Sequence, residues 1–535
     1  MTPDAAPPSP DSETIYGRFR RTLDAHPDRP LLWFEGETWT YRDTERAVDS
    51  RAAFLADCGV EPGDRVALLC PNDPEFVFLF LATARLGATF VPLNHRQEGE
   101  VLAHLLGDAD PRVLVVEGSV APAVAAVDDA VSTEGVYRYD PPTAERAAES
   151  GLDARDYRDA LDSTKSDVPA PVAVSPTDVA VLTYTSGTTG PPKGVQNPHR
   201  SYVEAGERLA DACGTDETDR GLLVLPLFHA NPTTYGLMQM LAVGGSIAPV
   251  REFSASGFFE TARASESTFF THVGSVLEIL QRTLDSGDVD PTSSLRFAVG
   301  GAAQFERQRE FESETGVQLV RLYGLSELGA GLVTTCRYDS DADHGATHQG
   351  RVEDAPFDVR ILSPDGTSYA DAGERGEILV RPDEPGLAFH GYRDRYAETV
   401  EAWRDLWMHT GDVGVVEDGV LRYVGREKTS IRVGGENVSP WEVEAALDGW
   451  DAVETAVAVG VDDEVAGQVV GLWVVPADDS LTPEAVHDRC RERLADHLVP
   501  TYVGFLDSVP RTSTQKVERV RLSERSFAGA WEAER

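Results

Sequence analysis

The sequence contains very little lysine. Only four of its 48 basic residues are Lys (Lys165, Lys193, Lys428 and Lys516), whereas Asp and Glu number 90, so the formal net charge is −42. A field this negative repels phosphate backbones and anionic lipid heads, which argues against nucleic acid and membrane surfaces as partners. Because Arg serves as the ordinary basic residue of this chain, each remaining Lys is of interest.

Cysteine and long apolar runs are also scarce. The five cysteines stand singly without a C-x-x-C pair, which is typical of reduced thiols and gives no disulfide frame or zinc site. The N-terminus lacks the basic and apolar regions of a signal peptide. The most apolar run, 76–82, is far shorter than the roughly 20 residues of a membrane-spanning helix. We therefore expect a cytoplasmic chain with no integral membrane segment.

The excess of acidic residues has two interpretations. Strong acidity with little Lys resembles the halophilic proteins of salt-loving archaea, in which carboxylates keep a crowded surface solvated. A GC-rich genome that writes few Lys codons would produce the same scarcity of Lys. The composition is otherwise that of an ordinary globular protein, with 41% apolar and 26% charged residues.

A chain of 535 residues is too long to fold around a single hydrophobic core, so we expect a large part and at least one smaller part. From residue 65 onward, and again from 221 to 324, apolar strands alternate with helical patterns, which predicts α/β structure with parallel-rich sheets flanked by helices. The intervening segment 118–176 is rich in Ala, Asp, Ser and Pro and has weak periodicity, so we expect it to be loosely packed or insertion-like.

The last third of the chain has a different pattern. After residue 355 the strands become short and closely spaced, which predicts a small antiparallel barrel within the same large domain. From about residue 430 a compact α+β pattern follows. We therefore expect an N-terminal domain at 1–425, a hinge at 426–429 and a small C-terminal domain at 430–535.

A twelve-residue run, YTSGTTGPPKGV at 184–195, directly follows an apolar strand. Hydroxyl side chains supply hydrogen-bond donors, glycines let backbone N–H groups approach an anion, and a Lys adds positive charge. It is not a Walker loop, in which Ser or Thr follows the Lys, because Gly194 follows Lys193 here. The run therefore predicts a polyphosphate-binding loop, with candidate residues Thr185, Ser186, Gly187, Thr188, Thr189, Gly190 and Lys193.

Together with four later motifs, this run resembles the adenylate-forming superfamily of acyl-CoA synthetases, nonribosomal peptide adenylation domains and beetle luciferases. The later motifs stand in the family's order: YGLSE at 323–327, HTGD at 409–412, GREK at 425–428 with GGENVSP at 434–440, and PRTSTQKV at 510–517. One short motif is weak evidence, but five in order over nearly the whole chain are strong. The resemblance implies a ligase that activates a carboxylic acid with ATP.

The resemblance also implies which residues bind ATP. The loop from Thr185 to Lys193 would hold the β- and γ-phosphates, and Glu327 would bind Mg²⁺. Adenine would stack on Tyr323 and meet the backbone near Gly301. Asp412 would accept hydrogen bonds from the ribose hydroxyls. The remaining candidates for nucleotide binding are Ala302, Gly324, Ser326, which keeps the hydroxyl of the more usual Thr, and Arg426.

Catalysis is assigned by the same resemblance to Lys516, with Glu327 and Thr185. Lys516 would bridge the substrate carboxylate and the α-phosphate as charge builds in the transition state, although Gln515 replaces the Gly that is common before this Lys. Three of the four Lys fall in the phosphate loop, the hinge and this terminal loop. A compact ammonium differs from the planar guanidinium of Arg at a crowded reaction centre, so this distribution supports the assignment.

In the second half-reaction of the family, a thiol attacks the acyl adenylate after the C-terminal domain rotates. The hinge candidates are Lys428 and Thr429, since Thr429 stands where many relatives have Asp. The arm of coenzyme A would pass along the loop that contains Gly434, Gly435 and Glu436.

The acyl pocket is the least specific prediction. Amino-acid-activating relatives place an Asp after the Phe of the segment that corresponds to 226–229, and His229 stands there in this chain, which argues against an α-amino acid. Candidate pocket residues are His229, Thr234, His272, Gly301, Gly324 and Gly329.

We therefore expect an AMP-forming acyl-CoA synthetase for a fatty or other organic acid. It would use ATP, Mg²⁺ and CoA, with its oligomeric state, monomer or homodimer, left open. A second hypothesis is an adenylation enzyme that loads a carrier-protein phosphopantetheine in trans. A third is a non-catalytic nucleotide-binding module, against which the presence of Glu327, Asp412 and Lys516 argues.

Overall fold

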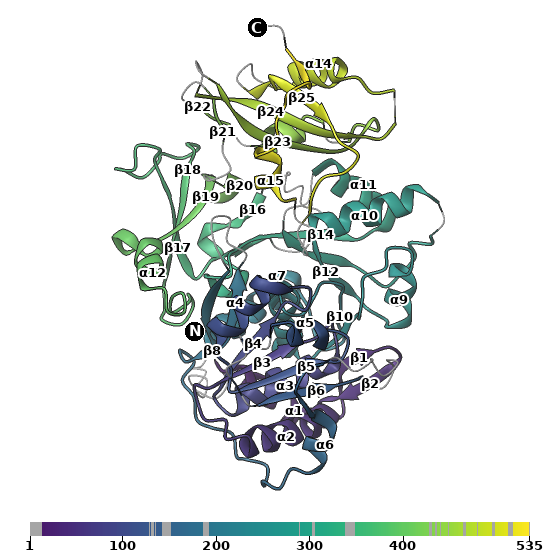
Figure 1. The fold of residues 1–535 in the computed structure, drawn as a ribbon, viewed down its shortest axis with the longest axis vertical. Helices are drawn as coiled ribbons and strands as arrows, with labels where there is room; N and C mark the ends of the chain where they lie inside the picture. The colour runs from purple at the N-terminus through teal and green to yellow at the C-terminus, as the bar shows by residue number, and fades with distance from the viewer. Residues whose placement is uncertain are drawn as a thin grey trace, which may run out of the picture.

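A computed structural model shows how these patterns fold. It describes residues 13–127, 129, 133, 135–141, 151–185, 192–287, 289–301, 305–336, 348–426, 431–433, 436–438, 440–447, 449–463, 467–478, 480–494, 498–511 and 517–533. Over these ranges the strands form four sheets, and the sheet nearest the C-terminus lies at one end of the elongated molecule (Figure 1).

The first sheet has a parallel centre built from apolar strands. Its strand order is β7-β6-β5-β3-β4-β8-β9, and only β9 runs antiparallel to its neighbour. The strands are β3 (Arg65–Leu69), β4 (Thr89–Leu93), β5 (Val113–Glu117), β6 (Val136–Tyr139), β7 (Arg155–Asp156), β8 (Val179–Thr185) and β9 (Lys193–Pro198). Because both faces are covered by helices, β4 and β5 are buried at every position. The helices of this region are α1 (Ile15–Ala25), α2 (Tyr41–Asp57), α3 (Pro74–Arg85), α4 (Gly99–Ala109), α5 (Ala121–Ala125) and α6 (Tyr157–Asp162).

The second sheet carries the longer series of alternating strands and helices. Its order is β15-β14-β13-β12-β10-β11-β1-β2, parallel from β14 to β1 and antiparallel at both edges. The strands are β1 (Pro30–Phe34), β2 (Glu37–Thr40), β10 (Arg220–Leu223), β11 (Ser246–Pro249), β12 (Phe269–Val273), β13 (Phe297–Gly301), β14 (Gln318–Tyr323) and β15 (Thr334–Thr335).

Two layers of helices cover this second sheet. One face packs in the same core as α3, which is buried along its whole length. The elements on this side are α7 (His199–Cys213), the π-helix η3 (Asn231–Met238) and α8 (Gln239–Val243). The other face packs against α9 (Phe258–Ala264), α10 (Gly274–Asp285) and α11 (Phe305–Thr315). The expected helices and strands are thus present, and the expected α/β class is confirmed.

Two smaller sheets follow. The antiparallel one has the order β16-β20-β19-β18-β17, from β16 (His348–Arg351), β17 (Phe357–Leu362), β18 (Gly376–Pro382), β19 (Met408–Glu417) and β20 (Val420–Arg426). Short helical elements border it at η4 (Gly329–Gly331), η5 (Val352–Asp354), α12 (Tyr396–Ala402) and η6 (Arg404–Leu406).

The C-terminal sheet contains β21 (Ile431–Val433), β22 (Glu436–Val438), β23 (Val453–Asp463), β24 (Gly467–Pro476), β25 (Tyr502–Phe505) and β26 (Trp531–Glu532). Its helices are α13 (Pro440–Ala445), α14 (Pro483–Arg493) and α15 (Arg519–Ser523). It contacts the rest of the molecule at α10, where Arg282 donates to the carboxylate and the carbonyl of Glu454, each at 2.8 Å.

The described parts of segment 118–176 contain more regular structure than the composition indicates. It supplies β6, which extends the first sheet in parallel with β5, and β7 at the edge. The ring of Tyr157 on α6 is 2% exposed and packs edge-on against Phe54 at 5.2 Å. Strands of four and two residues are too short to produce a readable alternation, which is why the pattern concealed them. Among the helices so far described, none is long and apolar enough to cross a membrane.

Buried histidines make the stability of the fold dependent on pH. Burial lowers the pKa of both His199 and His272 to about 4, below the 6.5 or so of an unfolded chain. The stability is therefore present above pH 6.5 and is lost as pH falls toward 4, because the unfolded chain binds these protons first. At pH 5.5 the two residues together lower the free energy of unfolding by about 3 kcal/mol relative to pH 7.5.

Denaturant unfolding at pH 7.5 and 5.5 checks this expectation. His199→Gln should remove part of the difference between the two midpoints, whereas His26→Gln, at an exposed position, should leave it unchanged. An equal pH dependence in wild type and His199→Gln would contradict it.

Candidate active site

The carboxyl end of β14 lies where three sheets meet. Tyr323 ends this strand, and its hydroxyl donates to Oδ2 of Asp412 on β19 at 2.9 Å. Both side chains are buried, at 5% and 3% exposure. Burial and the Asp412 carboxylate raise the pKa of Tyr323, so the phenol stays neutral and keeps its proton for this hydrogen bond.

Gly324, next along the chain, lies against another backbone segment. A Cβ added here would lie 1.6 Å from the carbonyl oxygen of Gly331, so only glycine permits this crossing. Two side chains of η3 hold the 329–331 turn in place: Thr234 donates to Ala330 O at 3.0 Å, and Tyr235 donates to Gly331 O at 2.6 Å. Thr234 and Gly324, both predicted from sequence, are thereby brought together.

Glu327 is linked to the phosphate-loop strand through a tyrosine that no motif marks. The Tyr392 hydroxyl donates to Glu327 Oε1 at 2.9 Å. The ammonium of Lys193 lies 4.8 Å from the centroid of the same ring, a cation–π distance. The contact arises because Val195 on β9 forms a β-bridge with Tyr392. Sequence reasoning therefore identified Glu327 and Lys193 but missed the residue between them.

The described ends of the phosphate loop are anchored by α4. Thr185 ends β8 and pairs with Lys193 at the start of β9. Tyr184 donates to Asp108 Oδ2 at 2.7 Å, and the His104 ring is 3.0 Å from Pro192 O. These contacts hold both ends of the loop at the carboxyl edge of the first sheet, next to Glu327.

The HTGD segment is shaped by Glu377, another residue that sequence reasoning missed. Glu377 accepts from the Gly411 N–H at 3.0 Å and lies 2.8 Å from His409 Nδ1. Gly411 has φ +67°, a turn conformation that glycine adopts without strain. The Thr410 hydroxyl accepts from the Asp412 N–H at 3.1 Å, which completes the turn that presents Asp412 to Tyr323.

The segment 226–229 is positioned by Asn72, which lies in the loop between β3 and α3. The Asn72 amide donates to Leu225 O and Val250 O, each at 2.9 Å, and accepts from the Leu227 N–H at 2.7 Å. The ring of Phe228 then lies 4.2 Å from that of His229. Asn72 thus joins the two sheets below the predicted acyl pocket.

The structure separates His272 from the other pocket candidates. Its ring lies 5.9 Å from Phe270, whose side chain belongs to the core under α9, α10 and α11. Gly301 lies two residues after Val299 on β13 and therefore faces the same side of the sheet. The Val299 side chain packs on the η3 side, opposite to the side of Phe270. Gly329 lies in the turn behind Gly324.

Several predicted residues lie outside the described ranges, and for two others only the backbone is described. Outside the ranges are Ser186, Gly187, Thr188, Thr189, Gly190, Ala302, Lys428, Thr429, Gly434, Gly435 and Lys516. Arg426 ends β20, where its backbone is in register with Asp412, and Glu436 begins β22. Ser326 is described and lies between the Tyr323 and Glu327 positions.

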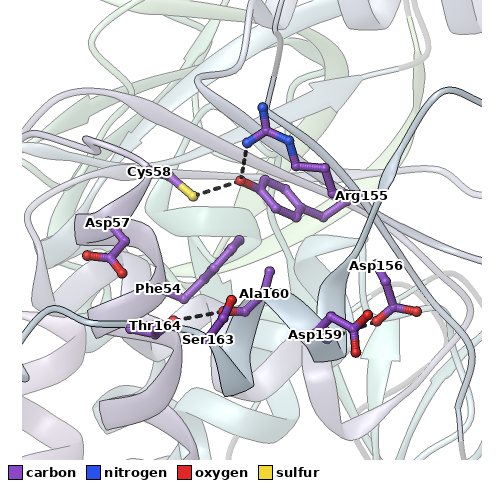
Figure 2. Close-up of a pocket in the computed structure, with 10 residues that line it drawn as sticks. Phe54, Asp57, Cys58, Arg155, Asp156, Asp159, Ala160, Ser163 and Thr164 are labelled. Carbon is purple, nitrogen blue, oxygen red and sulfur yellow. Dashed lines mark hydrogen bonds between the residues drawn. The ribbon is translucent and has the colours of Figure 1, made fainter.

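A separate hollow of about 350 Å³ lies between β6, β7, α2 and α6 (Figure 2). The Tyr137 hydroxyl in its wall is 3.2 Å from Cys58 Sγ and accepts from Arg155 at 3.2 Å. Burial raises the pKa of Cys58, so the thiol is a poor nucleophile. The hollow is lined by none of the residues that the sequence identified, and we assign it no role.

The chain matches two protein families. Residues 19–392 match the AMP-binding enzyme family, and residues 442–516 match the AMP-binding enzyme C-terminal domain. Among curated proteins, it is 33% identical over 502 residues to a 3-[(3aS,4S,7aS)-7a-methyl-1,5-dioxo-octahydro-1H-inden-4-yl]propanoyl:CoA ligase of Rhodococcus jostii, covering 91% of this chain and 93% of that protein. It is 31% identical to a feruloyl-CoA synthase of an Amycolatopsis species, with coverages of 92% and 94%.

Solved structures agree with the fold. The anthranilate CoA ligase AuaEII in complex with anthranoyl-AMP superposes with a TM-score of 0.86 over 95% of this chain and 96% of that one. At 23% sequence identity this likeness is evidence for the fold alone.

Proposed function

The chain belongs to the AMP-binding enzyme family and is an AMP-forming acid–CoA ligase, and from this premise we propose that it activates a fatty or other organic acid. The acid first attacks the α-phosphorus of ATP, which gives an acyl adenylate and pyrophosphate. CoA then attacks the adenylate and AMP leaves. The observation that carries the proposal is the Tyr323–Asp412 hydrogen bond, which joins the motifs at 323–327 and 409–412 in one buried site.

We propose that this pair holds the nucleoside. The Asp412 carboxylate is buried, and hydrogen bonds from hydroxyls to a carboxylate are strong. Tyr323 presents its ring for adenine, with its orientation set by the bond from its own hydroxyl to Asp412. Arg426, at the register position opposite Asp412, would assist at the ribose.

The triphosphate lies, in this proposal, between Lys193 and Glu327. Two anions meet in the first step, so neutralisation and positioning must supply most of the rate. Glu327 Oε1 is occupied by the Tyr392 hydroxyl, and Oε2 has no hydrogen-bond partner among the described residues. Thr185 would add its hydroxyl from the end of β8.

The residues present fit Mg²⁺ bound together with ATP. No group of three His, Cys, Asp or Glu side chains able to hold a metal occurs in the described part of the chain. A single carboxylate plus substrate phosphates is a common way to bind Mg²⁺, so Glu327 suits an ion that arrives with the nucleotide. When bound, the ion would neutralise phosphate charge.

We propose that Lys516 bridges the carboxylate and the α-phosphate, and that the C-terminal domain then turns about Lys428 or Thr429. The thiol arm would pass beside Gly434, Gly435 and Glu436. This division assigns 1–425 to binding of ATP and the acid, 426–429 to the hinge and 430–535 to the mobile domain. The net charge of −42 is consistent with an enzyme that is active in concentrated salt.

Pyrophosphate release across a panel of carboxylic acids, in low and molar salt and with and without CoA, tests the function. We expect acid-dependent release, and acyl-CoA formation when CoA is present. Release without acyl-CoA would favour loading of a carrier-protein phosphopantetheine, whereas no release with any acid would favour the non-catalytic nucleotide-binding module.

A further inference from the structure

The hydroxyl of Thr271 is buried. Thr271 lies on β12 with 0% exposure, and its Oγ1 has no hydrogen-bond partner among the described residues. Its side chain shares a face with Phe269, two residues earlier, which packs in the core on the η3 side of the sheet. The hydroxyl therefore lies between β12 and η3.

A second unsatisfied atom belongs to Asn231, the first residue of η3. Its Nδ2 donates to the backbone carbonyl of His272 at 3.1 Å, which places the amide beside the end of β12. The buried Oδ1 has no hydrogen-bond partner in the part of the chain that the structure describes. Exchanging the two amide atoms would set oxygen against the His272 oxygen, so the unsatisfied atom is an acceptor.

The neighbouring polar groups on η3 are all satisfied by backbone carbonyls. Thr233 donates to Leu227 O at 2.8 Å, Thr234 to Ala330 O at 3.0 Å and Tyr235 to Gly331 O at 2.6 Å. An unpaired buried polar group costs about 1–3 kcal/mol, and native proteins keep few of them. Thr271 and Asn231 have two such atoms together on the η3 side of this strand end, and we infer that a group from outside the protein pairs with them.

These atoms lie within the reach of a molecule bound at the end of β14. Thr271 is paired with Val299 on β13, and Gly301 follows two residues later on the same face. A Cβ added at Gly301 would meet one described atom within 4 Å, Leu322 O at 3.9 Å. The glycine thus leaves room for an acyl group to pass from the Tyr323 strand toward Thr271 and Asn231.

We propose that Thr271 and Asn231 bind a hydroxyl group of the acid, at a position remote from its carboxylate. The substrate hydroxyl donates to Asn231 Oδ1 and accepts from the Thr271 hydroxyl. A plain alkyl or aryl acid would leave both protein atoms unpaired, and sites built for a substrate hydroxyl reject analogues that lack it. The inference rests on the proposed acid–CoA ligase function and adds its substrate class, a hydroxylated carboxylic acid.

Matched pairs of acids test the proposal. They are octanoate and ω-hydroxyoctanoate, phenylpropanoate and its para-hydroxy analogue, and cyclohexanecarboxylate and its para-hydroxy analogue. The wild-type enzyme should prefer the hydroxylated member of at least one pair by about tenfold or more in kcat/KM. Thr271→Val, which keeps the shape, should reduce that preference about tenfold, and Thr271→Ser, which keeps the hydroxyl, should retain most of it.

Thr83→Val is the matched control. Thr83 is also 0% exposed, and within the described ranges its hydroxyl has no partner, but it lies in α3, so its replacement should leave the preference unchanged. Equal use of both members of every pair, or an unaltered preference in Thr271→Val, would overturn the hydroxyl site while leaving the ligase function in place. Failure of every acid, plain or hydroxylated, to release pyrophosphate would overturn the ligase function and this inference with it.

Discussion

Lys516→Ala should abolish carboxylate-dependent pyrophosphate release and spare the attack of CoA on supplied acyl adenylate. In the first step two anions approach each other, and a positive charge placed between them stabilises the transition state much more than the separated reactants. Loss of one such group lowers kcat by about 10²–10³-fold or more. In the second step a neutral thiol or its thiolate attacks an acyl adenylate already formed, so the same charge is not required.

The measurement follows pyrophosphate from ATP and acid, and acyl-CoA from synthetic acyl adenylate, in the same preparations. Lys165→Ala supplies a matched control, because Lys165 is exposed and its backbone N–H, which the substitution keeps, donates to Asp57. The control should retain both activities. Equal loss of both steps in Lys516→Ala would contradict the assigned role.

Asp412→Asn should raise the KM for ATP and lower kcat/KM about 10²-fold. Asp412 is 3% exposed and its carboxylate already accepts from Tyr323. Hydrogen bonds to a charged group contribute about 1.5–3 kcal/mol each, and the amide can accept at one atom only. The loss should appear for ATP and leave the KM for the acid nearly unchanged.

Tyr323→Phe is the companion variant for this position. It keeps the ring for adenine and removes the hydroxyl that orients it, so we expect a decrease of only about fivefold, since one hydrogen bond to a charged group is lost and another donor can replace it. Steady-state kinetics at saturating acid separate the two variants. An unchanged KM for ATP in Asp412→Asn would contradict a role in ribose binding.

The two variants also show how far the sequence leads. Tyr323, Asp412, Glu327 and Lys193 were predicted from motifs that stand at the spacing of the family. Their mutual contacts could not be read in this way, since Tyr323 and Asp412 are 89 positions apart and lie in different sheets. Tyr392 and Asn72 were missed because neither stands in a motif.

His272 shows that position in the sequence alone leaves open which face of a strand a side chain occupies. It follows Thr271 directly, yet successive side chains of a strand point to opposite faces, so only one of them shares a face with Gly301. The alternation in the sequence shows which side chains share a face of the strand. Which of the two faces is open to a ligand depends on the helices that pack on each side.

The sequence by itself determined the class of the fold, the order of its parts and the chemistry of the reaction. Alternating apolar strands and helices permit few architectures, and the motifs stand in the order of the family along nearly the whole chain. The tertiary structure decided which buried polar atoms of the described residues have a hydrogen-bond partner and which, as at Thr271 and Asn231, have none. That outcome depends on contacts between elements far apart in the chain, because a hydrogen bond forms only where packing brings donor and acceptor within about 3 Å.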